Sequence, residues 1–300
     1  MNREKVGFIG LGIMGKPMAK NLIKAGFNLI VYDIRNEPVN ELVMFGAERA
    51  NSPKEVAERS DIIITMLPDG PDVEKVVCGP NGLIEGLKRG SIVIDMSSIS
   101  PTIARKIAKE VEKRGGEMLD APVSGSEPSA IEGTLAIMVG GKKEIFDKCL
   151  PLFNAMGKTI TYVGESGAGQ VTKLCNQIIV ALNIIALSEA FVLAVKAGLK
   201  PEEVFQAIRG GLAGSVVMER KVPMIIRRNF NPGFKIKLHQ KDLRNVILFA
   251  IEHNVPLPFT SLALQVLNTL VNEGKGELDH SAIVHFFESL AKIEVKSEKV

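Results

Sequence analysis

Hydrophobic and polar positions follow two different periods along this chain. Up to about Gly164, short apolar runs rich in β-branched residues alternate with segments whose apolar positions recur every three or four residues. The runs are nearly continuous, as in strands buried on both faces of a parallel sheet. They read KVGFIG, NLIVYD, DIIITMLP, SIVIDMSS, EMLDAPVSG, TLAIMVGG and TITYVG. The pattern predicts an α/β domain with a doubly wound, mostly parallel sheet over residues 1–164.

Beyond Gly164 every apolar pattern has the helical spacing. A long helix is predicted over about residues 172–197, ended by Gly198, and further helices separated by Gly, Asn and Pro follow it. Residues 165–300 are therefore predicted to form an all-α helical domain. The long helix is apolar around most of its circumference, which predicts burial on all sides. We expect another subunit to supply part of that burial in a homo-oligomer, a dimer or a tetramer.

Composition and charge exclude several classes of protein. The net charge of +3, the absence of a Lys/Arg block and the scarcity of aromatic residues argue against a nucleic acid partner. The uncharged apolar run at residues 174–188 is shorter than the roughly 20 residues that cross a bilayer, so no membrane span is expected. Three distant cysteines without a CxxC pair, and a chain that enters a strand without a signal peptide, predict a cytoplasmic protein.

A glycine-rich loop follows the first predicted strand and opens a helix. It consists of Gly10, Leu11, Gly12, Ile13, Met14 and Gly15. Such a loop lets the backbone approach a pyrophosphate at a helix N-terminus, and Asp33, at the end of the next strand, can accept hydrogen bonds from ribose hydroxyls. A plain glycine turn with an ordinary aspartate is the simpler alternative. The combination predicts a Rossmann dinucleotide-binding domain. Asp33 favours NAD(H), and the nearby Arg35 leaves NADP(H) possible.

Two further strand ends supply loops at the same edge of the sheet, where ligands of open α/β sheets bind. Leu67 and Pro68 close IIITMLP, and Ser98 closes IVIDMSS. Each loop can equally be an ordinary strand-to-helix turn with a serine cap.

Lys173 is the only charged residue between Glu165 and Glu189, at the head of the long apolar helix. A lysine stem can lie along apolar surface with its ammonium in water. An isolated buried charge is costly unless it is used or solvated, which makes Lys173 a candidate for chemistry.

Six ordered segments resemble the β-hydroxyacid dehydrogenase family over essentially the whole chain: GFIGLGIMGKPMAKNL, MLPDGPDVEKVV, IDMSSISP, LDAPVSGSEPSAIEGTLAIMVGG, GAGQVTKLCNQ and KLHQKDLRN. Several segments, TKLCNQIIVALNI and AIRGGLAGS among them, are closer to the tartronate semialdehyde reductase branch. The resemblance implies hydride transfer between a nicotinamide cofactor and a small hydroxy acid or aldehyde acid. It favours reduction of a three-carbon aldehyde acid, with 3-hydroxyisobutyrate dehydrogenase and glyoxylate or succinic semialdehyde reductase as alternatives.

The resemblance also assigns roles to individual residues. Lys173 matches the catalytic acid/base; an ammonium there can stabilise and protonate the carbonyl oxygen, and burial should lower its pKa from the usual value of about 10.4. Ser124 and Gly125 match the loop that binds the substrate carboxylate, although Ser126 stands where the family usually has glycine. Asn176 and Gln177 are further residues that the resemblance assigns to substrate binding. Asp72 and Lys241 are assigned to cofactor binding, and Asp242 is expected to orient the segment that carries Lys241.

Other readings of the sequence remain. The four histidines are scattered along the chain and no Cys or carboxylate cluster accompanies them, so we expect no metal. A non-catalytic dinucleotide-binding module would be expected to lack Lys173. A 6-phosphogluconate dehydrogenase-like enzyme would need a much longer helical domain.

Overall fold

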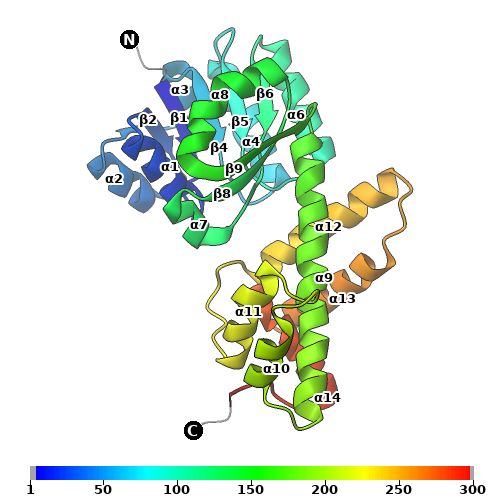
Figure 1. Ribbon diagram of the computed structural model, residues 1–300. Coiled ribbons are helices and arrows are strands. Elements are labelled where there is room, and N and C mark those ends of the chain that lie inside the picture. Colours follow the sequence, from blue (N-terminus) through cyan, green and yellow to red (C-terminus); the bar gives the residue numbers. More distant parts are fainter. Residues whose placement is uncertain (1–4, 298–300) are drawn as a thin grey trace. The chain divides into compact units, whose positions relative to one another are not determined.

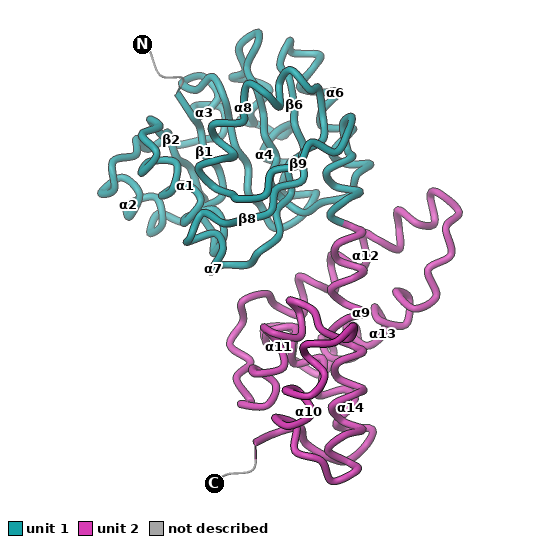
Figure 2. Tube along the Cα trace, viewed as in Figure 1, with its two compact units in different colours: residues 1–173 teal, residues 174–300 magenta. Residues whose placement is uncertain are grey.

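The computed structural model describes residues 5–297, and the chain divides into two compact units, residues 1–173 and 174–300 (Figure 2). The first unit contains a nine-stranded sheet with the order β3-β2-β1-β4-β5-β6-β8-β7, in which β9 also pairs with β8 (Figure 1). The strands are β1 (Lys5–Ile9), β2 (Asn28–Tyr32), β3 (Glu48–Arg49), β4 (Ile62–Thr65), β5 (Ile92–Asp95), β6 (Glu117–Asp120), β7 (Val123–Ser124), β8 (Leu135–Gly140) and β9 (Gly157–Gly164).

Strands β1 to β6 are parallel, and β8 runs antiparallel to β6 and β7. The order reverses between β1 and β4, which is where a doubly wound sheet binds its ligand. The predicted fold class is confirmed: a Rossmann-type sheet is followed by a helical part. The two-residue strand β3 has no apolar run in the sequence, and β7 was hidden within the segment EMLDAPVSG.

Helices cover the sheet in two layers, because successive side chains of each strand point to opposite faces. Phe8 and Ile64 join a core with α1 and α8, whereas Ile9 and Ile63 join a second core with α3, α4 and α6. Each buried side chain of this size contributes roughly 1.5–3 kcal/mol. The helices are α1 (Gly15–Lys24), α2 (Asn36–Met44), α3 (Pro53–Arg59), α4 (Gly70–Cys78), α5 (Leu83–Gly86), α6 (Pro101–Lys113), α7 (Ser126–Glu132) and α8 (Lys143–Met156).

Helix α9 (Ala168–Lys196) begins four residues before the predicted start at residue 172. The reason is tertiary: the carboxylate of Asp120, at the end of β6, accepts hydrogen bonds from the backbone N–H groups of Gly167 and Gln170. It thereby satisfies two N–H groups that a helix start leaves without an intrahelical partner. No pattern within residues 165–172 reveals a cap that comes from another strand.

The second unit is formed by most of α9 and by the helices that follow it. These are α10 (Pro201–Ile208), α11 (Val216–Ile226), α12 (Ile236–Glu252), α13 (Pro258–Asn272), the 3₁₀-helix η1 (His280–Ile283) and α14 (Val284–Ala291). Further helices follow residue 197, as predicted, and the 3₁₀-helix η1 directly precedes α14. Ala181 and Ile184 of α9 pack with α12 and α13, and Phe191 packs with α11.

Helix α9 is long and apolar enough to span a membrane, judged by length and composition alone. The buried side chains just described show that one side of this helix packs in the core of the second unit. The side chains of Ile179 and Leu193 are nevertheless 61% and 71% exposed, so the single chain does not by itself bury this helix on all sides.

Candidate active site

The glycine-rich loop connects β1 to α1. Gly10 has a φ of +92°, and a Cβ atom on it would collide with the carbonyl oxygen of Met66; one on Gly15 would collide with the carbonyl oxygen of Gly10. A Cβ on Gly12, by contrast, would have nothing within 4 Å. Packing therefore explains Gly10 and Gly15 but not Gly12, whose open side fits the close approach of a ligand phosphate. Of the other loop residues, Leu11 is buried, Ile13 is half exposed, and Met14 precedes α1 without a side-chain cap.

Asp33 lies at the end of β2, and its carboxylate is tied to the glycine-rich loop. Its Oδ2 accepts the backbone N–H of Leu11 at 2.7 Å, and its Oδ1 accepts the backbone N–H of Arg35 at 2.8 Å. The Arg35 guanidinium also bonds to this carboxylate at 3.1 Å. Burial by itself would raise the pKa of Asp33, but the hydrogen bonds from Arg35 and Leu11 outweigh it and the pKa is lowered. Asp33 is therefore an anion at neutral pH.

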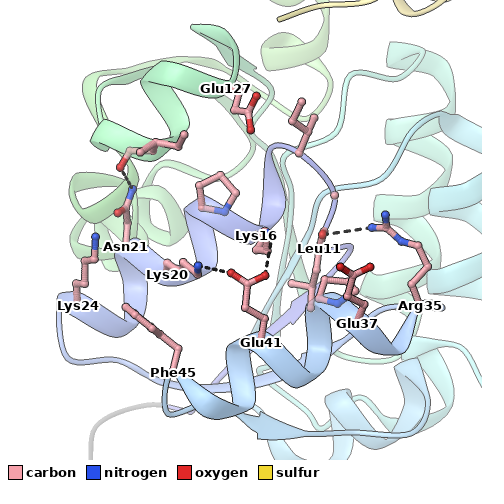
Figure 3. Close-up of a pocket in the computed structure, with 15 residues that line it drawn as sticks. Leu11, Lys16, Lys20, Asn21, Lys24, Arg35, Glu37, Glu41, Phe45 and Glu127 are labelled. Atoms are coloured by element: carbon pink, nitrogen blue, oxygen red, sulfur yellow. Dashed lines mark hydrogen bonds and ion pairs between the residues drawn. The ribbon is translucent and has the colours of Figure 1, made fainter. Parts of the chain in front are cut away.

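A pocket of about 710 Å³ opens beside the loop, between α1 and α2 (Figure 3). Lys16 and Lys20 both bind the carboxylate of Glu41 across it, at 2.8 and 2.5 Å. These two hydrogen bonds lower the pKa of Glu41 to about 2. The charges of Lys16 and Lys20 are thus already shared with a carboxylate, and Lys24 also lines the pocket.

The loops after β4 and β5 are linked to each other. The backbone N–H of Leu67 donates to Ser97 Oγ at 2.9 Å. Pro68 and half-buried Ser98 lie in the same two loops, and Asp72 is exposed in the first turn of α4. The structure therefore brings Leu67, Pro68 and Ser98 to one edge of the sheet, the edge at which the glycine-rich loop leaves β1.

Ser124 ends β7, and Gly125 and Ser126 follow it directly. Gly125 has a φ of +145°, and a Cβ on it would lie 2.6 Å from the Cβ of Ser129, so only glycine fits. Ser126 has a φ of +61°, a left-handed conformation that is strained for serine. This explains in physical terms why glycine suits the position of Ser126.

Lys173 lies in the second turn of α9 and is 7% exposed. The helical turn before Lys173 packs closely against the ends of β6 and β8. There is no room for a side chain at Gly140, because its Cβ would lie 2.6 Å from Asp120 Oδ1 and 2.8 Å from Gly169 N. The small residues of this segment thus bring the helix start against the strand ends and set the position of Lys173.

Within the second unit, four of the sequence-predicted residues form one chain of polar contacts. Asn176 Nδ2 donates to Gln177 Oε1 at 2.8 Å, and Gln177 Nε2 donates to Asp242 Oδ2 at 2.5 Å. The ammonium of Lys241 lies 2.9 Å from Asp242 Oδ1. Buried Asp242 therefore contacts both Gln177 and Lys241.

The histidines are less scattered than expected. His239 and His280 are both buried, with their Nδ1 atoms 3.0 Å apart, and His239 Nε2 lies 3.3 Å from the carbonyl oxygen of Gln177. A carbonyl accepts only, so His239 donates from Nε2 and accepts at Nδ1 from His280. Among residues 5–297, no group of three or more His, Cys, Asp or Glu side chains could hold a metal ion.

Sequence reasoning missed a set of polar residues buried at the strand ends. Asp95 and Asp120 are register neighbours on β5 and β6. Burial raises the pKa of each to about 6, although hydrogen bonds from Ser97 and Thr65 to Asp95, and from Gly167 and Gln170 to Asp120, oppose it. Gln170, in the first turn of α9, is fully buried. The available signal was a polar residue ending each of the apolar runs IIIT, IVID and EMLD.

Comparison with known proteins identifies the group to which this architecture belongs. Residues 5–164 match the family model for the NAD-binding domain of 6-phosphogluconate dehydrogenase, and residues 167–287 match the NAD-binding model of NADP-dependent 3-hydroxyisobutyrate dehydrogenase. The chain belongs to the β-hydroxyacid dehydrogenase family. As a β-hydroxyacid dehydrogenase it is an NAD(P)-dependent oxidoreductase that acts on a small molecule.

Similar β-hydroxyacid dehydrogenases differ in their substrates. The chain is 49% identical over 287 residues to 2-hydroxy-3-oxopropionate reductase of Escherichia coli K12, covering 96% of this chain and 98% of that protein. It is 40% identical to 2-(hydroxymethyl)glutarate dehydrogenase of Eubacterium barkeri, with 97% of each chain covered. Among solved structures, Mycobacterium tuberculosis 3-hydroxyisobutyrate dehydrogenase with L-serine has a TM-score of 0.88 at 32% identity, covering 95% of this chain and 99% of that one.

Proposed function

We propose that this β-hydroxyacid dehydrogenase reduces tartronate semialdehyde (2-hydroxy-3-oxopropionate) to glycerate, reversibly. The observation that carries the substrate is the 49% identity, over 96% of the chain, to the reductase of E. coli that is named for it. Gln177 adds support, because it follows the pattern of that branch and is held by Asp242.

The proposed mechanism assigns one task to each group. The reduced nicotinamide, when bound, supplies a hydride to the aldehyde carbon. Lys173 donates a proton from its ammonium to the oxygen that receives the carbonyl electron pair, and in the reverse direction the neutral amine takes the hydroxyl proton. Ser124 and Gly125 bind the substrate carboxylate through the hydroxyl and backbone N–H groups.

Asn176 and Gln177 bind the rest of the substrate in this proposal. The Gln177 amide has a determined orientation, because Nε2 donates to Asp242 and Oε1 accepts from Asn176. Lys241, bound to the same carboxylate, is proposed to bind the cofactor.

We propose NAD(H) as the preferred cofactor, because three cations that line the pocket beside the end of β2 are each paired with a carboxylate. Arg35 is bound to Asp33, and Lys16 and Lys20 are bound to Glu41. A 2′-phosphate would meet the Asp33 carboxylate before it met a free cation. NADP(H) would require Arg35 to leave Asp33.

A substrate panel tests the proposal. Purified protein is assayed with tartronate, methylmalonate and succinic semialdehydes, with 2-formylglutarate and with glyoxylate, each with NADH and NADPH. The highest kcat/KM is expected for tartronate semialdehyde with NADH. Turnover of another aldehyde acid without turnover of tartronate semialdehyde rejects the substrate and keeps the enzyme class.

The role of Lys173 is tested by Lys173→Ala. We expect kcat to fall by about 10²–10⁴-fold, the usual contribution of general acid catalysis, with the Kd for NADH nearly unchanged. Lys196→Ala, at the far end of α9 where the ammonium binds the carbonyl of Ala291, serves as the control and should keep its turnover. Near-normal turnover in Lys173→Ala would reject the mechanism.

We also propose a cytoplasmic homo-oligomer. The three cysteines are all free in the structure, which suits a reducing compartment. The exposed apolar side chains of α9 are the observation that favours association.

A further inference from the structure

Gln170 uses both ends of its side-chain amide in the interior of the first unit. Its Nε2 donates to the carbonyl oxygen of Ser97 at 2.7 Å, and its Oε1 accepts the backbone N–H of Ile99 at 3.1 Å. A flipped amide would set N–H against N–H and oxygen against oxygen, so this orientation is the only one that satisfies both partners. The amide therefore holds the loop after β5 on either side of Ser98.

The backbone of Gln170 is held as firmly as its side chain. Its N–H donates to Asp120 Oδ2 at 2.9 Å, and the N–H of Gly167 donates to Asp120 Oδ1 at 2.7 Å. The first turn of α9 is thus fixed to the end of β6 through Asp120 and to the loop after β5 through Gln170.

The same network continues to the loop after β4. Ser97 accepts the N–H of Leu67 on Oγ at 2.9 Å and donates its own N–H to Asp95 Oδ1 at 3.2 Å. Thr65 Oγ1 donates to the same Asp95 oxygen at 2.8 Å. A continuous buried chain of hydrogen bonds therefore joins the ends of β4, β5 and β6 to the turn that precedes Lys173.

We propose that Gln170 is a positioning residue for hydride transfer: it locks the turn that carries Lys173 to the loops that carry Leu67 and Ser98. This inference rests on the proposed function. Lys173 lies three residues after Gln170, about 4.5 Å along the helix axis, so a shift of the first turn is passed to the ammonium. A displacement of about 1 Å at a reacting group can cost about 100-fold in rate.

The first test is Gln170→Met, which keeps the length of the side chain and removes both hydrogen bonds. With tartronate semialdehyde and NADH we expect kcat per cofactor-binding site to fall about 10- to 100-fold. The Kd for NADH should stay within about 2-fold, and the Ile99 amide should exchange hydrogen faster. Ser188→Ala is the matched control: it removes a buried hydrogen bond of α9 to Ile184 and should leave kcat unchanged. Wild-type kcat in Gln170→Met would overturn the proposal.

Gln170→Glu provides a second test that does not depend on how well the methionine variant folds. One carboxyl oxygen can accept from Ile99, but the other can donate to Ser97 only when protonated. Asp120, which accepts the backbone N–H of residue 170, and Asp95, which accepts the N–H of Ser97, favour the protonated form when they are ionised. Arg105, which bonds to the carbonyl oxygen of Ser166, and Lys173, three residues further along α9, oppose it. The ratio of its kcat to that of the wild type should rise as the pH falls from 8 to 6. A ratio that does not change with pH contradicts the proposal that the side-chain hydrogen bonds of Gln170 position the turn that carries Lys173.

The two levels of proposal fail differently. A wild type that reduces no aldehyde acid with either cofactor removes the proposed function, and the positioning role with it. A wild type that is active, beside a Gln170→Met variant of equal kcat, removes the positioning role alone.

Discussion

At the scale of single residues, Ser126 is strained where the family resemblance leads one to expect glycine. Its φ of +61° costs a residue with a Cβ about 1 kcal/mol, and glycine pays nothing for that conformation. We therefore expect Ser126→Gly to raise the free energy of unfolding by about 1 kcal/mol, measured by urea titration. Gly125→Ala is the opposing control, since its Cβ would overlap Ser129, and it should be destabilising. A destabilised Ser126→Gly would mean that the hydrogen bond from its hydroxyl to the Gly125 carbonyl outweighs the strain.

The buried carboxyl of Asp95 predicts a pH dependence of stability. Burial, reinforced by the charge of Asp120, raises its pKa from 3.8 to about 6. A raised pKa in the folded state contributes stability below pH 4, and this contribution is lost as the pH rises through 6. Its size is at most about 3 kcal/mol, since one pKa unit corresponds to about 1.4 kcal/mol.

Asp95→Asn tests this linkage. The free energy of unfolding of the variant, relative to the wild type, should increase between pH 4.5 and pH 7.5 as the wild type loses the contribution of Asp95. Urea titrations at several pH values measure the difference, whatever constant offset the substitution adds. A difference that stays flat over this range would show that Asp95 does not titrate there.

At the scale of elements, the unit of β1, α1 and β2 determines the choice of cofactor. Asp33→Ser removes the carboxylate at the end of β2 and frees Arg35 from its partner. We expect the ratio of kcat/KM for NADPH to that for NADH to rise at least 10-fold. The 2′-phosphate is then no longer repelled by the Asp33 carboxylate and is attracted by the Arg35 guanidinium. Asp61→Ser, at the opposite end of the sheet before β4, is a control that should leave the ratio unchanged. An unaltered ratio in Asp33→Ser would place cofactor selection elsewhere.

The sequence predicted an element correctly wherever the interactions that form it lie within its own residues. The seven apolar runs correspond to strands, and the segments with helical spacing correspond to helices. Both patterns depend only on the residues within each segment, so they can be recognised from the sequence. The start of α9 was predicted four residues late because its cap, Asp120, lies nearly fifty residues earlier in the chain. The start of α3 (Pro53–Arg59), by contrast, is capped locally: Ser52 Oγ accepts the backbone N–H of Glu55, and the Glu55 carboxylate accepts the backbone N–H of Asn51.

The candidate site divides in the same way. Loop glycines, Asp33 and Lys173 could be recognised from motifs and from an isolated charge. The pairing of His239 with His280, and the tie from Gln170 to Ser97, could not, because each joins residues more than forty positions apart. Long-range polar contacts leave no period in the sequence.

At the scale of the whole molecule, α9 presents apolar side chains that its own chain does not cover. Ile179, Ala186 and Leu193 are exposed and recur every seven residues, so they lie on one side of the helix. Ala186 is small enough to allow another helix to approach closely. A second copy of this chain, offering the same stripe about a two-fold axis, would cover all three.

Leu193→Glu tests this association without touching the proposed chemistry, since it lies 20 residues, about 30 Å along the helix, from Lys173. The wild type should have the mass of a dimer or a tetramer by light scattering, and the variant should shift to a lower mass. Leu212→Glu is the matched control, because Leu212 is fully exposed in the loop between α10 and α11 and should not change the mass. A monomeric wild type would remove the proposed oligomer. An oligomer that survives Leu193→Glu would place the interface away from this stripe of α9.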